Sequence, residues 1–302
     1  MATERELNKR IKSIKNISQV TSALAAVSAS KASRAQKQVE ATRAYASKAF
    51  EILNNLASQP GMGSATHPLL TARSEIKNTA LVLITGDRGL AGSYNSNMVS
   101  RAERFLKALH TPAEVITVGR KGRDLMIRRG YNVVATFDGI PDPPSILDVT
   151  PVAQIITDDY LQGKVDQVFI GYTDYINLIS RRPSVKQLLP LKPLDLSGMA
   201  VAEYVSDVDT GISAARAYTY EPDPALLLDN IVPRFTQLQI FQSVLEALAS
   251  EHSARMVAMN NATDNAAELI DILTLERNKA RQASITNEIL DIVGGAEALA
   301  QL

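Results

Sequence analysis

The 302-residue sequence contains no cysteine and no tryptophan, and aromatic residues make up only 5% of it. The absence of cysteine excludes disulfide bonds and every catalytic or metal site that depends on a thiolate. No apolar run approaches the roughly 18 residues that a membrane-spanning helix needs. The first ten residues, MATERELNKR, also lack the apolar segment of a secretory signal. We therefore expect a protein that is made and used in a reducing compartment.

Glycine and proline are nearly absent from both ends of the chain. All 13 prolines and all but two of the 15 glycines lie between residues 60 and 233, so residues 1–59 and 234–293 contain neither helix breaker. A continuous helix of either length would extend about 90 Å, whereas a compact chain of this size has a radius of gyration of about 20 Å. This segregation predicts a rod of paired helices with a globular middle.

The N-terminal segment predicts one helix from about Glu4 to Ala57, with Thr3 as its N-cap and Glu6 three residues later. Its apolar positions follow one another in steps of three and four: Leu7, Ile11, Ile14, Ile17, Val20, Leu24 and Val27. Alanine and serine dominate residues 22–35, and such small side chains allow two helix axes to approach closely. Because a lone helix could not bury the apolar stripe, we expect it to pair with another helix. The alternative is a solvated alanine-rich helix.

The middle of the chain predicts a Rossmann-like α/β domain with a mostly parallel sheet. Short, β-branched, nearly continuous apolar runs are typical of strands covered on both faces, and amphipathic helical segments separate them here. The expected strands are residues 80–85, 114–119, 132–137 and 166–172, and the expected helices are residues 97–109, 121–129 and 151–161. An edge strand within residues 176–189 is a further expectation. Residues 190–222, rich in proline, aspartate and serine, would lead back to the helices.

The C-terminal segment predicts a second long helix, with Asp223 as its N-cap and Pro224 at its first position. Pro233 lies inside the helical pattern, so a kink or a restart is expected near Val232. From residue 241 onward the pattern follows an a/d ladder of fifteen positions. Four of these are polar, namely His252, Arg255, Glu276 and Asn287. A coiled coil tolerates such positions at a cost in stability, whereas a helix surrounded by other protein accommodates them.

These patterns divide the chain into three predicted parts: residues 1–59, residues 60–220 and residues 221–302. The net charge is zero, with 32 basic and 32 acidic residues, but residues 1–60 carry ten basic and four acidic side chains. The basic side chains are spread along the first helix without interleaved aromatic residues, which argues against nucleic acid as the partner. An acidic protein surface is the favoured partner, and a merely solvated helix face is the alternative.

No motif for catalysis or cofactor binding is evident. The sequence GDRGLAGS at residues 86–93 follows a predicted strand, where phosphate loops occur, but its spacing fits neither the P-loop nor the dinucleotide pattern. We interpret it as a tight strand-to-helix turn, and the alternative is a surface loop whose Asp87 and Arg88 contact a partner. The histidines are isolated in sequence, and no carboxylate pair stands out. We therefore expect neither an active site nor a bound cofactor or metal.

A polar band in the last helix is unusual for an exposed helix face. It places several hydrogen-bonding side chains within two turns: Arg281, Gln282, Ser284, Thr286, Asn287 and Glu288. These side chains point in several directions, so a single partner helix could not contact all of them. The band predicts a helix ringed by partners, and a solvated polar surface is the alternative.

At these residues the chain resembles a known family. The segments EPDPALLLDNIVPRF, LASEHSARMVAMNNATDNAAELI and NKARQASITNEILDIVGGAEAL closely resemble the C-terminal helix of the gamma subunit of F-type ATP synthases. RIKSIKNISQVTSALAAVSASK is similar to the N-terminal helix of that family, and TGDRGLAGSYN to its central-domain signature. The resemblance covers essentially the whole chain. Two departures are the replacement by Ala91 of a cysteine common in that signature and the absence of the cysteine-bearing insertion of chloroplast forms.

The resemblance implies a non-catalytic rotor shaft, present in one copy per assembly. Its antiparallel coiled coil would stand inside a ring of three alpha and three beta subunits, and its α/β domain would contact the epsilon subunit and the c-ring. The shaft would transmit torque between proton flow and the nucleotide sites of the beta subunits. It would lie on the cytoplasmic side of a bacterial inner membrane, attached only through the complex. No cofactor and no nucleic acid are implied.

The same resemblance assigns contacts to individual residues. Arg281, Gln282, Thr286 and Glu288 would face the catch region of the beta subunits, and the basic N-terminal helix would meet their acidic lever loop around Leu24. Relatives typically carry Lys-Ala-Met and a second methionine near this point, where the chain has Ser22-Ala-Leu24-Ala-Ala26. Two alternatives to a rotor are a nucleotide-dependent enzyme with helical arms and a static coiled-coil scaffold.

Overall fold

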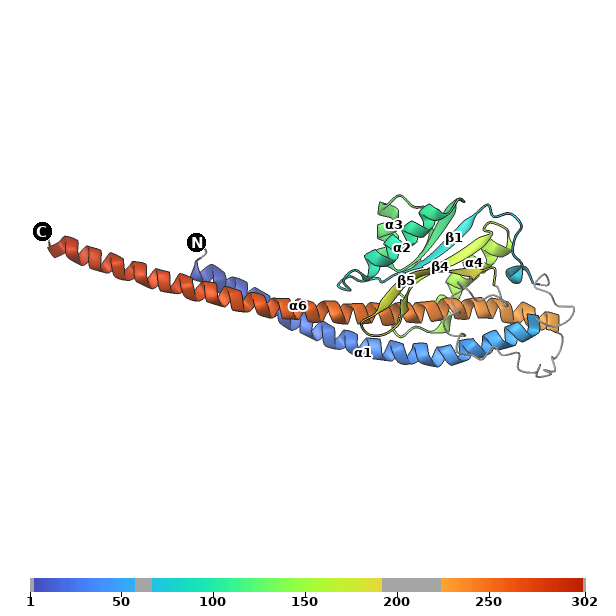
Figure 1. Cartoon of the computed structure of the whole chain (residues 1–302), viewed down its shortest axis with the longest axis horizontal. Helices are drawn as coiled ribbons and strands as arrows, with labels where there is room; N and C mark the ends of the chain where they lie inside the picture. Colours follow the sequence, from blue (N-terminus) through green and yellow to red (C-terminus); the bar gives the residue numbers. More distant parts are fainter. Residues whose placement is uncertain (1–2, 58–66, 192–223, 301–302) are drawn as a thin grey trace. The chain divides into compact units, whose positions relative to one another are not determined.

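The structure is a computed structural model that describes residues 3–57, 67–191 and 224–300. The chain divides into two compact units: residues 29–254 form the larger unit, and residues 1–28 with residues 255–302 form the smaller one. Two long helices contribute to both units, α1 over Glu4–Ala57 and α6 over Pro224–Ala300 (Figure 1). Both long helices are confirmed. The predicted N-cap Asp223 lies outside the described residues, and the three-part division of the chain stays a prediction.

The start of α1 carries the predicted capping box. The hydroxyl oxygen of Thr3 accepts a hydrogen bond from the Glu6 amide at 3.4 Å, and the Glu6 carboxylate accepts one from the Thr3 amide at 3.1 Å. Two backbone donors that have no partner within the helix are thereby satisfied. The capping box is confirmed.

The buried side of α1 differs from the predicted apolar stripe. Leu7 and Ile11 are buried, but Ile17, Val20 and Val27 are 53%, 59% and 54% exposed. The apolar stripe takes six steps from Leu7 to Val27, which are 20 residues apart. The buried and half-buried positions take six steps from Leu7 to Ser28, which are 21 residues apart, and this is the 3.5-residue period of a coiled coil. The stripe therefore drifts around the helix and leaves the buried side. The fully buried positions are Leu7, Ile11, Thr21, Ala25 and Ser28 in the smaller unit and Ala32, Ala35, Val39, Ala46, Phe50 and Leu53 in the larger one.

The larger unit contains a five-stranded sheet with strand order β3-β2-β1-β4-β5. All neighbouring strands are parallel except β4 and β5, which form an antiparallel pair. The strands are β1 (Thr79–Ile84), β2 (Ala113–Val118), β3 (Val133–Phe137), β4 (Gln167–Tyr175) and β5 (Arg181–Leu189). The mostly parallel α/β domain is confirmed, and β5 is the predicted edge strand.

Helices cover both faces of this sheet (Figure 1). They are α2 (Tyr94–Ala108), α3 (Arg120–Arg128) and α4 (Thr150–Leu161), with short 3₁₀ helices η2 (Pro68–Leu70) and η3 (Ile146–Val149). On one face, α2 and α3 pack over Leu81 and Leu83, whereas α4 and the larger-unit parts of α1 and α6 pack over Val82 and Ile84. Every residue of β1 is buried, which explains its continuous apolar sequence.

Helix α6 runs through Pro233 as one element, so the expected restart near Val232 is wrong. A proline inside a helix costs about 3 kcal/mol. Leu228, Val232 and Phe235 are all at least 97% buried, and full burial of each such side chain contributes about 1.5–3 kcal/mol. Packing on the sheet therefore outweighs the proline.

Within the larger unit α1 and α6 run antiparallel. Val39 shares a cluster with Leu245. Phe50, which comes later in α1, has its ring 6.1 Å from that of Phe235, which comes earlier in α6.

Candidate partner-binding interface

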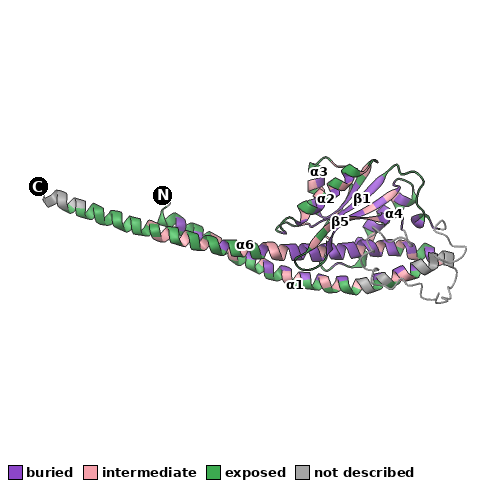
Figure 2. Ribbon diagram, viewed as in Figure 1, coloured by how far each residue is buried: buried purple, intermediate pink, exposed green. Residues whose placement is uncertain are grey.

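The predicted polar band lies on a part of α6 that is exposed on all sides. Every residue from 281 to 293 whose burial is described is exposed (Figure 2). The hydroxyl of Thr286 donates to the backbone oxygen of Gln282 at 2.9 Å, and the hydroxyl of Ser284 donates to the Glu288 carboxylate at 3.3 Å. These bonds stay within the helix, so the guanidinium of Arg281 and the amide of Gln282 are presented outward.

The same turns also expose large apolar side chains. Their exposed fractions range from 49% to 71%, and they are Ile285, Ile289, Leu290, Ile292 and Val293. Because successive residues are about 100° apart, these five side chains lie on one broad side of the helix, which Gln282 and Thr286 share. An exposed surface that mixes large apolar and hydrogen-bonding side chains is typical of a protein–protein interface.

Leu24 lies at the edge between the buried and exposed sides of α1. It is half-buried, and its backbone oxygen accepts a hydrogen bond from the Ser28 hydroxyl at 2.7 Å. Val20 and Val27, next to it on the helix surface, are more than half exposed. One turn away, the hydroxyls of Thr21 and Thr263 are 2.7 Å apart and join α1 to α6 within the smaller unit. The structure therefore places Leu24 at the edge of an exposed apolar surface formed by Val20 and Val27.

Asp87 and Arg88 lie in the loop after β1 and differ in their surroundings. The Asp87 carboxylate accepts hydrogen bonds from the backbone amides of Arg120 and Gly139, both at 2.9 Å, and so holds the loop against the ends of β2 and β3. Arg88 is exposed. Leu90 is 64% exposed and has a φ of 62°, in the left-handed region that non-glycine residues seldom adopt. Asp87 thus shapes a loop that presents Arg88 and Leu90.

The larger unit contains a charged cluster that no sequence motif indicates. The Asp142 carboxylate accepts a hydrogen bond from the Lys31 ammonium at 2.8 Å and lies 3.0 Å from Nε2 of His252. Partial burial raises the pKa of Asp142, but the hydrogen bond from Lys31 and the proximity of His252 outweigh it and lower the pKa below its usual value. His252, although isolated in sequence, thus meets an acidic group in the fold. Its partner is 110 residues away in sequence, so no local spacing could have revealed it.

Within the described ranges, no group of three or more histidine, aspartate or glutamate side chains is arranged to hold a metal ion. No helix in the same ranges has an apolar stretch long enough to cross a bilayer. The candidate site is therefore a set of exposed helix and loop surfaces: the α6 end at residues 281–293, the α1 surface around Leu24, and the loop with Arg88 and Leu90.

Comparison with known proteins identifies the family. A family model described as ATP synthase matches residues 3–299. The ATP synthase gamma chain of Roseiflexus castenholzii is 43% identical over 306 residues that cover the whole of both chains. The chain belongs to the ATP synthase gamma-chain family. The gamma chain of Dehalococcoides mccartyi strain CBDB1 is likewise 43% identical, over 260 residues that cover 86% of each chain.

Chains in solved ATP synthase structures have the same fold. A chain in the F1/c-ring structure of Euglena gracilis mitochondrial ATP synthase in rotational state 3 is 20% identical and has a TM-score of 0.65. The alignment covers 98% of this chain and 94% of that one. A chain in the rotor structure of the same enzyme is 18% identical, with a TM-score of 0.62 and coverage of 93% and 98%. The resemblance seen in the sequence is thus confirmed at the level of family and fold.

Proposed function

We propose that this gamma-chain family member is the central rotating shaft of an F-type ATP synthase. It would couple ion flow through the c-ring to the opening and closing of the nucleotide sites of the beta subunits, and would carry out no chemistry itself. One copy would stand in a ring of three alpha and three beta subunits and would also contact the epsilon subunit and the c-ring. Its attachment to the cytoplasmic side of the membrane would be indirect, through the complex.

The exposed end of α6 is the observation that carries this proposal. Water hydrates the polar side chains of this part of α6, but its large apolar side chains are unfavourably exposed. A surrounding sleeve of partner subunits would bury the apolar side while hydrogen-bonding Arg281, Gln282, Thr286 and Glu288. Gamma-chain family membership over the full length of the chain supports the same assignment.

Two further surfaces would contact the beta subunits. The helix that carries Leu24 has ten basic and four acidic residues in positions 1–60, and this charge suits an acidic lever loop. In the loop after β1, Arg88 and Leu90 would make the direct contact, and Asp87 would fix the loop conformation that presents them. Strain of the kind seen at Leu90 is common where a loop is shaped for binding.

The test uses the complete ATP synthase reconstituted in vesicles, with Arg281→Ala and Glu288→Ala in this chain. We expect loss of most proton-driven ATP synthesis, because removal of a charge that is hydrogen-bonded in a desolvated interface is strongly unfavourable. Arg101→Ala is the matched control, since Arg101 is an exposed helical arginine on α2, outside these surfaces. ATP synthesis should remain unchanged in that variant.

A second variant removes residues 281–302 altogether. Unchanged coupled synthesis in that complex would contradict the rotor role of these residues and favour a static scaffold. The enzyme alternative is tested with the isolated chain. ATP turnover by the purified chain alone would contradict the non-catalytic assignment. A preparation of an inactive protein, which should show no turnover, is the control.

A further inference from the structure

One turn of α6, residues 250–254, is buried on every side. Successive helical residues are about 100° apart, so five consecutive residues cover the full circumference of a helix. All five are at least 92% buried, although the sequence, Ser-Glu-His-Ser-Ala, is largely polar. A surface helix has one buried face, whereas this turn is enclosed by its own unit. Figure 2 shows the long buried stretch of α6 to which it belongs.

The enclosing groups come from the carboxyl ends of the parallel strands. The Ser250 hydroxyl donates to the backbone oxygen of Thr173 in β4 at 3.0 Å. The Ser253 hydroxyl donates to the backbone oxygen of Leu178, in the turn between β4 and β5. Ala254 packs in a cluster with Ala91 and Tyr94 of the loop and helix after β1. This edge of the sheet is where α/β domains usually bind their ligands, and here the α6 turn occupies it.

Two further side-chain contacts complete the enclosure. The carboxylate of Glu251 lies so close to Gly86 that a Cβ on that glycine would be 2.7 Å from three atoms of the carboxyl group. On the next residue, Nε2 of His252 is 3.0 Å from the carboxylate of Asp142, in the loop after β3. The same Asp142 oxygen binds the Lys31 ammonium of α1 at 2.8 Å. The loop after β3 is thereby tied to both long helices at once.

We propose that residues 250–254 form a torsional joint that locks α6 to the α/β domain, with Gly86, Asp142 and Lys31 as its positioning residues. The joint ends where the larger unit ends, at Ala254. A helix gripped around its whole circumference cannot rotate about its own axis without breaking contacts on several loops at once. This inference rests on the proposed rotor function for its purpose, since torque has to pass between the helix and the domain, but its geometry is independent of that function.

The first test is hydrogen exchange in the isolated full-length chain carrying Gly86→Ala. The added methyl group overlaps with the Glu251 carboxylate, so the loop and the α6 turn have to move apart. We expect amide exchange in residues 250–254 to accelerate about tenfold, the effect of overpacking one buried contact. Gly89→Ala is the matched control, because a Cβ at Gly89 in the same loop would meet nothing within 4 Å. The double variant Gly86→Ala/Glu251→Ala should restore slower exchange, since the shorter side chain leaves room for the methyl group.

Equal exchange rates in wild type and Gly86→Ala would overturn the joint. So would the same acceleration in Gly89→Ala. Asp142→Asn provides a second variant that keeps the side-chain volume and removes only the charge, in case Gly86→Ala does not fold. It should accelerate exchange in residues 250–254 about threefold through the weaker contacts with Lys31 and His252. An unchanged rate in a folded Asp142→Asn variant would also overturn the proposal.

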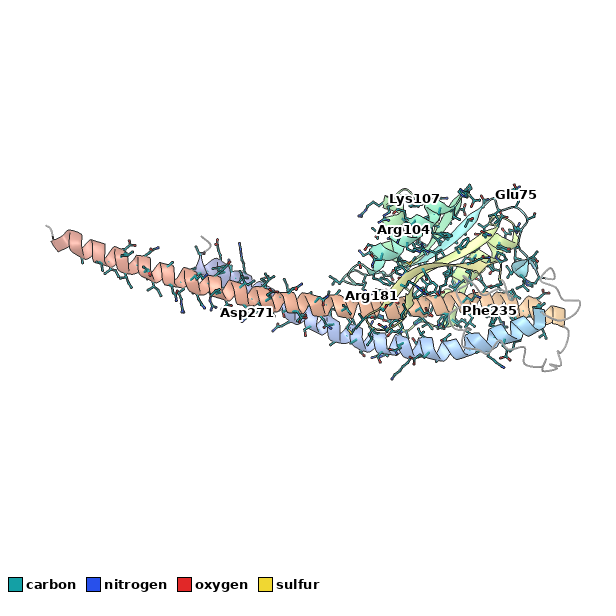
Figure 3. The ribbon with its side chains drawn as sticks, viewed as in Figure 1. Glu75, Arg104, Lys107, Arg181, Phe235 and Asp271 are labelled. Atoms are coloured by element: carbon teal, nitrogen blue, oxygen red, sulfur yellow. The ribbon has the colours of Figure 1, made fainter. Side chains whose placement is uncertain are left out.

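The second test measures torque in the assembled ATPase. The chain has no cysteine, so Lys107→Cys on α2, with 69% of its side chain exposed, offers a single labelling site for a bead (Figure 3). Under ATP the torsional stiffness between bead and stator should fall at least twofold when Gly86→Ala is added. Unchanged stiffness would overturn the joint. A wild-type bead that does not rotate at all would instead overturn the proposed function, while the exchange results would still decide the joint.

Discussion

Two regions of helix α6 differ in the burial of their side chains: one buries polar side chains and the other exposes large apolar ones. In residues 224–254, Gln239 and Glu246 are buried to 98% and 99%, whereas in residues 281–293 Ile289 and Ile292 are 54% and 71% exposed. Figure 3 labels Phe235 in the first region and Asp271, which precedes the second. Burial in this helix therefore follows the surroundings that the fold provides and not the polarity of each side chain. The first region packs against neighbours within the chain, and the second exposes apolar side chains that the described residues do not cover.

The largest expected effect comes from the packed region. Phe235→Ala removes a side chain that is 97% buried and that packs against the ring of Phe50. We expect the free energy of unfolding of the free chain to fall by about 3–5 kcal/mol, because both apolar burial and cavity formation contribute. Urea unfolding monitored by circular dichroism measures it. Leu290→Ala, at a 62% exposed position, is the control, and an equal loss there would contradict the difference between the two regions.

A smaller effect of opposite sign is expected at a buried polar position. Both polar atoms of the Gln239 side chain are buried without a hydrogen-bond partner. Gln239→Met keeps the length of the side chain and removes these atoms, so it should raise the free energy of unfolding by about 1–2 kcal/mol. Gln237→Met is the matched control in the same turn. Gln237 donates hydrogen bonds to the backbone oxygen of Ile146 and to the Thr150 hydroxyl, so its replacement should destabilise the chain. Stabilisation by both variants would point to a general effect of methionine.

Much of the fold was predictable because it depends on local signals. The absence of glycine and proline predicted both long helices, Thr3 and Glu6 predicted the capping box, and the β-branched runs predicted the strands of a parallel sheet. Each of these follows from sequence neighbours within one element. The restart expected near Val232 does not occur, because the effect of Pro233 depends on how strongly the surrounding residues pack, which the local pattern does not contain.

The contacts around residues 250–254 could not be predicted for the same reason. Asp142 meets His252 and Lys31 across 110 and 111 residues of sequence, and Glu251 meets Gly86 across 165. The buried side of α1 was misjudged because an apolar stripe with a step slightly below 3.5 residues matches the coiled-coil period for only two turns. By contrast, the partner-facing residues were proposed from family resemblance, and the structure adds that their region is exposed in the free chain.

A pH-dependent effect is expected from the packed region. The lowered pKa of Asp142 means that its charged form is favoured in the folded state. Its contribution to stability is therefore present above the unfolded pKa of about 3.9 and is lost as the pH falls through the lowered folded value. At about pH 5 the free energy of unfolding of the wild type should exceed that of Asp142→Asn by no more than about 1 kcal/mol. The difference is small because the carboxylate is partly exposed and solvent screens its contacts. The difference should shrink below about pH 4 in urea unfolding series. A difference that grows toward acid would contradict the assignment.

The smallest expected effect belongs to the exposed region. Ile289→Ser replaces an apolar side chain that is 54% exposed, so the free energy of unfolding of the free chain should change by less than about 0.5 kcal/mol. The same substitution should weaken assembly with the alpha and beta subunits, because burial of this side chain there would contribute about 1.5–3 kcal/mol. Urea unfolding of the free chain and the yield of assembled complex at limiting subunit concentration measure the two effects. A large loss of stability in the free chain would mean that residues 281–293 are already covered there. Unchanged assembly would mean that this side of the helix faces no partner.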